Sequence, residues 1–152
     1  KSTKPIIDKL TSAIDVCKSS RGKGPTARLN AGTKLMNDTK ADLTQLKQFV
    51  STSDLQYQMI ADKLGLEILQ CGIDYYNDSD AAEVAHKAMV LQKYAQSVVV
   101  GKMARDRCKE NVDILTKIIA ELPPSEISWL IHQSSPILFL MQFRFIMAQE
   151  MT

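Results

Sequence analysis

The chain has few of the residues with which proteins usually carry out chemistry. Aromatic residues make up 6% of the 152 positions, and there are two histidines, His86 and His132. Such a low aromatic content, beside abundant Ala, Leu, Met, Lys and Gln, favours helix over sheet. Because convergent polar groups are sparse, we expect no catalytic site.

Cysteine is also scarce, and its count is odd. Cys17, Cys71 and Cys108 lie far apart, each within an apolar helical pattern. A disulfide framework normally has an even number of cysteines at close spacing, so we expect reduced thiols with a packing role. Arg107 and Lys109 would lower the pKa of Cys108 if that thiol were exposed. This cysteine usage predicts an intracellular protein, most simply a cytoplasmic one.

No apolar run is long enough to cross a membrane. The longest, ILFLMQFRFIM at residues 137–147, is interrupted by Gln142 and Arg144, and a span needs about 20 apolar residues. We expect this segment to be buried in the domain or its oligomer. Docking onto another domain and contact with a membrane surface are the alternatives. Its periodicity allows either a helix or a strand.

Helix-breaking residues are concentrated at a few positions. The chain from Ser79 to Leu122 contains no proline and one glycine, Gly101. We expect one long helix over about residues 80–121, or two helices joined at Gly101. A helix of roughly 40 residues would be about 60 Å long, more than a compact domain of this size needs.

Three earlier helices are predicted from apolar residues at three- and four-residue steps. The first starts near Pro5 and ends before the SSRGKGP stretch at 19–25, and the second covers about 26–50. The third, about 54–76, is apolar on two sides and should lie at the centre, with Gly65 and Gly72 allowing a neighbour to approach closely. Ser53 and Gln56 resemble a capping box at its start.

These patterns predict an all-α fold, an irregular antiparallel bundle of five or six helices. We expect a single helical domain over residues 1–152, with an apolar C-terminal segment at 125–152. The chain begins at Lys1 rather than at methionine, which suggests a fragment of a larger protein or a processed form.

Charge is unevenly distributed along the chain. Residues 1–50 contain ten Lys/Arg and four Asp/Glu, whereas residues 51–152 contain nine and thirteen. A basic loop and a basic helix face suggest an anion-binding surface, and nucleic-acid binding is therefore one alternative function. Its candidate residues are Arg21, Lys23, Arg28, Lys102, Arg105 and Lys109.

A second alternative is a small metal-dependent helical enzyme. Glu83 and His86 have the Glu-x-x-His spacing that places a carboxylate and an imidazole on one helix face, as in di-iron bundles. Those sites need a second such pair and two more carboxylates. His132 has no glutamate three residues before it, so we expect neither a metal nor another cofactor.

The function we expect is non-catalytic: a protein-interaction or scaffolding domain of a larger intracellular protein. The apolar C-terminal segment should bind a partner or a second copy of the chain, with Trp129 as the anchor. The predicted partner-binding residues are Trp129, Ile131, Leu138, Phe139, Met141, Phe143 and Phe145.

Overall fold

Prolines and glycines define the first helix boundaries in the computed structural model, which describes residues 2–79 and 83–122. Helix α1 (Lys4–Lys18) has a proline in its first turn, and helix α2 (Pro25–Phe49) begins on one. Between them, Gly22 and Gly24 have φ values of 78° and 100°, in the left-handed region that glycine adopts most readily. The loop between α1 and α2 is therefore encoded locally.

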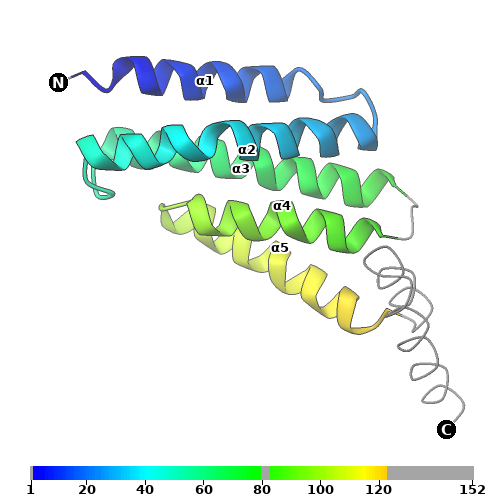
Figure 1. Cartoon of the computed structure of the whole chain (residues 1–152). Coiled ribbons are helices and arrows are strands. Elements are labelled where there is room, and N and C mark those ends of the chain that lie inside the picture. Colours follow the sequence, from blue (N-terminus) through cyan, green and yellow to red (C-terminus); the bar gives the residue numbers. More distant parts are fainter. Residues whose placement is uncertain (1, 80–82, 123–152) are drawn as a thin grey trace, which may run out of the picture.

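Three more helices complete the described part of the chain: α3 (Leu55–Asp78), α4 (Val84–Val98) and α5 (Lys102–Ala120). Successive helices run antiparallel, and α3 contacts each of the other four, while α1 contacts only α2 and α3 (Figure 1). Within residues 2–79 and 83–122 the protein is an all-α bundle of five helices. This confirms the predicted fold class and the central position of the third helix.

Helix α3 is buried along one of its two predicted apolar sides and partly exposed along the other. The first side is buried throughout, comprising Tyr57, Ile60, Ala61, Leu64, Ile68, Cys71 and Tyr75. On the second side Leu69 is buried, but Leu55 and Met59 at its start are exposed. Asp54 is the N-cap and accepts a hydrogen bond from Tyr57 N at 3.0 Å, so the predicted Ser53–Gln56 capping box is not the cap.

Close packing of α4 on α3 depends on glycine, as predicted. A methyl group at Gly65 would lie 2.5 Å from Val99 Cγ1 and 3.2 Å from the Ala95 carbonyl oxygen. A side chain there would force Val99 to move and press on the α4 backbone at Ala95. At Gly72 the corresponding distances are 3.1 Å to Gln92 Cγ and 3.2 Å to the Ala88 carbonyl oxygen.

Of the two alternatives for residues 80–121, the structure rules out a single helix and confirms two helices joined at Gly101, α4 and α5. Val99 and Gly101 have extended backbone, with ψ of 147° and 149°. Asp62 of α3 accepts hydrogen bonds from Val100 N at 2.6 Å and from Gly101 N at 3.1 Å. The carboxylate thus supplies partners for amides at the start of α5, so the chain turns back here. Gly101 has no positive φ, and the turn depends on a contact from another helix.

Candidate functional site

The most unusual feature of the described structure is a fully buried arginine in the first turn of α2. Arg28 is 2% exposed. Because α2 begins immediately after Gly24, its first turn lies beside the C-terminal end of α1. Arg28 Nη1 donates hydrogen bonds to the Cys17 carbonyl oxygen at 3.2 Å and to Ser20 Oγ at 3.0 Å. The guanidinium therefore ties α2 to the end of α1.

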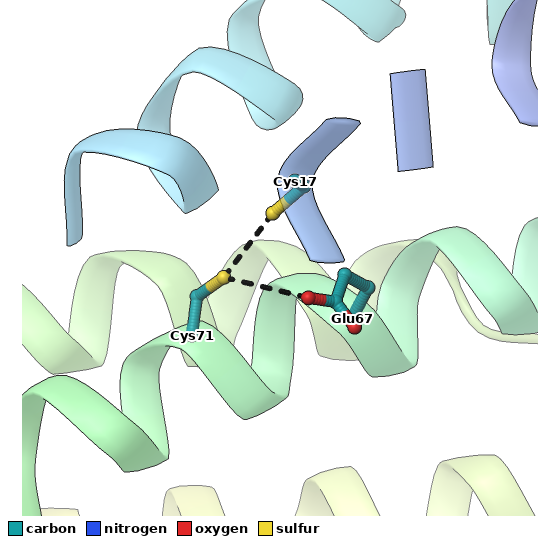
Figure 2. Close-up of side chains that lie close together, drawn as sticks. All are labelled: Cys17, Glu67 and Cys71. Atoms are coloured by element: carbon teal, nitrogen blue, oxygen red, sulfur yellow. Dashed lines mark hydrogen bonds between the residues drawn. The ribbon is translucent and has the colours of Figure 1, made fainter. Parts of the chain in front are cut away.

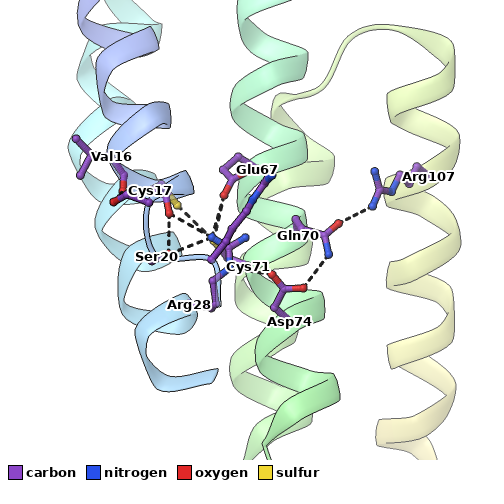
Figure 3. A network of polar contacts seen from close by, with 11 residues as sticks. Val16, Cys17, Ser20, Arg28, Glu67, Gln70, Cys71, Asp74 and Arg107 are labelled. Carbon is purple, nitrogen blue, oxygen red and sulfur yellow. Dashed lines mark hydrogen bonds and ion pairs between the residues drawn. The ribbon is translucent and has the colours of Figure 1, made fainter. Parts of the chain in front are cut away.

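Two carboxylates of α3 balance this charge. Arg28 Nη1 lies 3.0 Å from Glu67 Oε2, and Arg28 Nε lies 2.8 Å from Asp74 Oδ2 (Figure 3). Arg21, in the loop, donates to the other oxygen of Glu67. We call Arg21, Arg28, Glu67 and Asp74 the ion network. Its two guanidinium groups and two carboxylates compensate each other, as buried charges require.

A polar chain continues from the ion network to α5. Gln70 Nε2 donates to Asp74 Oδ1 at 2.8 Å, and Arg107 Nη2 donates to Gln70 Oε1 at 2.7 Å (Figure 3). One connected set of hydrogen bonds thus joins α2, α3 and α5. Within this set of described residues, one buried side-chain nitrogen has no hydrogen-bond partner: Arg28 Nη2.

Two cysteines lie against the ion network. Cys17 Sγ of α1 and Cys71 Sγ of α3 are 3.3 Å apart, and Cys71 Sγ lies 4.0 Å from Glu67 Oε2 (Figure 2). These three ligand atoms lie within 4.8 Å of one another, and all three residues are buried. This is the one cluster in the described part of the chain that brings three potential metal ligands together. Both thiols are free.

The two thiols differ in acidity. The hydrogen bond from Cys71 lowers the pKa of Cys17 below its usual value, and the positive charge of Arg28 acts in the same direction. For Cys71, the same hydrogen bond and burial raise the pKa.

Cys108 behaves differently from the other two cysteines. It is fully buried, and burial raises its pKa to about 11, outweighing the opposite effect of Arg107. A net lowering by the flanking cations required an exposed thiol, and this condition is not met. All three cysteines are free and buried, as a packing role requires.

A second site lies on the outer side of the ion network. A pocket of about 220 Å³ is bordered by cationic side chains from α1, the α1–α2 loop, α3 and α5. These are Lys18, Arg21, Lys63 and Arg107. Glu67 also lines the pocket, but it is already paired with Arg21 and Arg28. The pocket has the charge expected of an anion site.

The anion-binding residues suggested by the sequence do not form one surface. Arg21, Lys23 and Arg28 lie near the α1–α2 loop, whereas Lys102 and Arg105 lie near the start of α5, towards the opposite end of the bundle (Figure 1). Arg28 is buried and bonded to two carboxylates, so its expected exposure is wrong. Lys102 pairs with Asp106 and Lys109 with Asp113, each one helical turn away.

The Glu-x-x-His pair at the start of α4 forms no ligand cluster among the described residues. Glu83 pairs with Lys87 at 2.9 Å, which lowers the pKa of this carboxyl. His86 Nε2 is buried and has no partner within those residues. The three-ligand cluster that the structure does form uses cysteines and Glu67 instead.

The predicted partner-binding residues, from Trp129 to Phe145, lie outside the described residues, as does the whole 125–152 segment. In the described part, four large apolar side chains are exposed towards the end of the bundle where α2 meets α3 and α4 meets α5 (Figure 1). We call this set the apolar end surface: Phe49, Leu55, Met59 and Met103.

Sequence reasoning missed the buried cluster, although one signal was present. Glu67, Cys71 and Asp74 recur at steps of four and three, which places them on one face of a helix expected to be central. Two carboxylates on such a face require cationic partners. The partners, Arg21 and Arg28, come from a loop and helix whose position only the fold reveals.

Comparison with known proteins gives no relative for this chain: no family model, curated protein or solved structure matches it. In addition, none of the helices in residues 2–79 and 83–122 combines the length and apolarity needed to cross a bilayer.

Proposed function

We propose that this chain is a non-catalytic protein-interaction or scaffolding domain of a larger intracellular protein, located in the cytoplasm. It binds another protein chain through apolar side chains, in the first instance a second copy of itself. The apolar end surface is the single observation that carries this proposal.

The apolar end surface exposes side chains that a helical bundle normally buries. Leu55 is 71% exposed, Met59 59% and Met103 87%. Single exposed apolar residues are ordinary, whereas a contiguous apolar patch is typical of a protein contact site, and we propose that these four side chains form one. Two of the four are methionines, whose flexible side chains adapt to an opposing surface.

A second copy is the partner that best fits an apolar surface. In a two-fold symmetric dimer the same patch lies on both sides of the interface, so it must complement itself. Apolar side chains meet this condition, whereas a patch of one charge sign would repel its copy. The C-terminal residues from Trp129 to Phe145 are proposed as a further contact.

Molar mass in solution tests the proposal. Light scattering across a concentration series should show self-association of the full chain. Leu55→Glu combined with Met103→Glu should weaken it at least about tenfold, because two charges would have to be buried. Val90→Glu is the matched control, since Val90 is also exposed but lies in the middle of α4.

Two results would contradict the proposal: a full chain that stays monomeric throughout, or equal weakening by the α4 control. A chain lacking residues 136–152 separates the two contacts. Association that survives this truncation but not the double substitution belongs to the apolar end surface. Association lost on truncation belongs to the C-terminal segment.

The pocket lined by Lys18, Arg21, Lys63 and Arg107 supports nucleic-acid binding as a second candidate. Phosphate contacts would make the affinity fall steeply with salt. Anisotropy of a labelled oligonucleotide should show this fall, and Lys63→Gln combined with Arg107→Gln should flatten it. Lys34→Gln, on the exposed side of α2, is the control. A salt-independent signal would exclude this candidate.

A further inference from the structure

Cys17 and Cys71 combine the features of a reactive thiol and a resolving thiol. They are 54 positions apart in the sequence, and tertiary packing brings their sulfur atoms to 3.3 Å (Figure 2). Cys71 is fixed by close packing, because a methyl group at Gly32 of α2 would lie 2.6 Å from its Cβ. The pair is held in place by three helices.

Cys17 is buried but borders a pocket. A pocket of about 260 Å³ lies between α1 and α2, and Cys17 is part of its wall. The other residues along it are mainly apolar, including Ala13, Ala31 and Leu35. A molecule the size of hydrogen peroxide or a small organic hydroperoxide fits this space.

The environment of Cys17 favours its thiolate, the form that attacks a peroxide. Cys71 Sγ lies 3.3 Å from Cys17 Sγ, within hydrogen-bond distance, and Arg28 Nη1 donates a hydrogen bond to the Cys17 carbonyl oxygen at 3.2 Å. The hydrogen bond with Cys17 and burial raise the pKa of Cys71, whose sulfur remains beside Cys17. Cys108, buried on α5, lines neither this pocket nor the cysteine pair.

We propose that Cys17 and Cys71 form a hydroperoxide-sensitive dithiol, which closes into a reversible disulfide between α1 and α3. This inference goes beyond the proposed protein contact and does not depend on it.

The reaction balances in two steps. The Cys17 thiolate attacks one peroxide oxygen; an S–O bond forms, the O–O bond breaks, and the leaving hydroxide takes up a proton to become water. Cys71 sulfur then attacks the Cys17 sulfenic acid; the S–S bond forms, the S–O bond breaks, and the departing hydroxide takes the Cys71 proton. Two thiols are oxidised to one disulfide, and one peroxide is reduced to two waters. A dithiol reductant reverses the change by exchange.

A divalent metal fits the same atoms less well. Both oxygens of Glu67 accept hydrogen bonds from guanidinium groups, one from Arg21 and one from Arg28. A metal ion bound there would displace these bonds and lie next to two fixed positive charges. The thiol pair needs no such rearrangement to react with a neutral peroxide.

The disulfide would secure a helix at the edge of the bundle. Helix α1 contacts only α2 and α3, so a bond from Cys17 to Cys71 would anchor it covalently to the central helix. Oxidation should therefore slow hydrogen exchange in α1 more than in α4 or α5.

The test uses the full chain, reduced and then treated with hydrogen peroxide near equimolar concentration. Remaining thiols are alkylated after unfolding, and peptides are mapped by mass spectrometry. We expect a linked peptide pair containing Cys17 and Cys71, with Cys108 still alkylated and at least about tenfold slower to react. Dithiothreitol should restore all three thiols. In Cys71→Ser, Cys17 should stop at the sulfenic acid, which dimedone traps.

Cys108→Ser is the matched control and should react like the wild-type chain. Because the linked peptide is measured in the wild-type chain, a variant that fails to fold leaves the test intact. Equal oxidation rates at all three cysteines, or mixed pairing with Cys108, would overturn the proposal. So would a purified chain whose Cys17 and Cys71 carry zinc or copper and resist peroxide.

Discussion

The two ends of the bundle differ in what lies at their surfaces and interiors. Where α1 gives way to α2, charged groups are buried: Arg28 and Glu67 are nearly inaccessible and bonded to each other. Where α2 gives way to α3, apolar groups are exposed, with Leu55 and Met59 on the outside. At the first end charged groups are buried, and at the second end apolar groups are exposed. Globular proteins usually show the opposite arrangement.

The two ends are therefore expected to have different roles: the first stabilises the fold, and the second binds a partner. A buried ion network is sensitive to the loss of any member, because the remaining charge is left without compensation. Exposed apolar side chains make few contacts within the chain, so replacing them leaves the fold intact. We therefore expect substitutions at the first end to change the free energy of unfolding, and those at the second to change association.

The largest effect is expected for Arg28→Ala. Removing the guanidinium leaves Glu67 buried with only Arg21 beside it and takes a bond from Asp74. We expect a loss of about 3–5 kcal/mol in the free energy of unfolding, measured by urea denaturation. Lys34→Ala, which removes an exposed cation of α2 paired with Asp38, should cost under about 0.5 kcal/mol. Equal losses would show that the buried network contributes little.

The next largest effect is expected for Asp62, whose carboxylate holds the α4–α5 turn. Asp62→Ala removes the acceptor for Val100 N and Gly101 N, so the start of α5 loses its partner. We expect a loss of about 1–2 kcal/mol, as for other helix caps, with faster hydrogen exchange at the α4–α5 turn. Asp106→Ala, at an exposed pair with Lys102, is the control. Unchanged exchange at the turn would contradict this account of the helix break.

Exposed apolar side chains should contribute still less to the free energy of unfolding. Leu55→Gln leaves a polar side chain where Leu55 was 71% exposed, so the free energy of unfolding should change by under about 0.5 kcal/mol. Ile60→Ala, five residues away on the buried side of α3, should cost about 2–5 kcal/mol in the same thermal or urea assay. A large effect of Leu55→Gln would mean that this end is packed against something within the chain.

The smallest effect is expected for Glu83, a charged residue at the first end that does not belong to the ion network. Glu83 pairs with Lys87, and this hydrogen bond lowers the pKa of the carboxyl. A lowered pKa means that the pair stabilises the fold above the usual glutamate pKa and loses this effect as the pH falls. Glu83→Gln should cost about 0.2–0.5 kcal/mol at pH 7 and nothing in acid, in parallel denaturation curves. A difference that persists in acid would contradict the ion pair.

Much of the fold was predictable because its signals are local. Pro5, the glycine-proline loop before Pro25 and the apolar periodicities gave the first three helices within a few residues. Gly65 and Gly72 indicated close packing, which α4 confirms. The break between α4 and α5 was not decided, since Gly101 adopts an ordinary φ and the turn depends on Asp62, some 38 positions earlier.

The candidate site was less predictable than the fold. The sequence predicts that Cys17 and Cys71 are buried packing residues, and their burial is confirmed. Their proximity has no sequence signal, because nothing near either residue specifies which helix faces it. Arg28 was assigned to a solvated basic loop, whereas it lies inside the protein. The predicted contact at Trp129 to Phe145 stays a prediction.

Sequence alone determined which segments are helical, because backbone preferences and the spacing of apolar residues act over a few positions. Only the tertiary structure decided which charges are buried, which thiols meet and where the fourth and fifth helices separate. Each of these depends on a contact between residues tens of positions apart, and such contacts arise from how whole helices pack rather than from any local pattern.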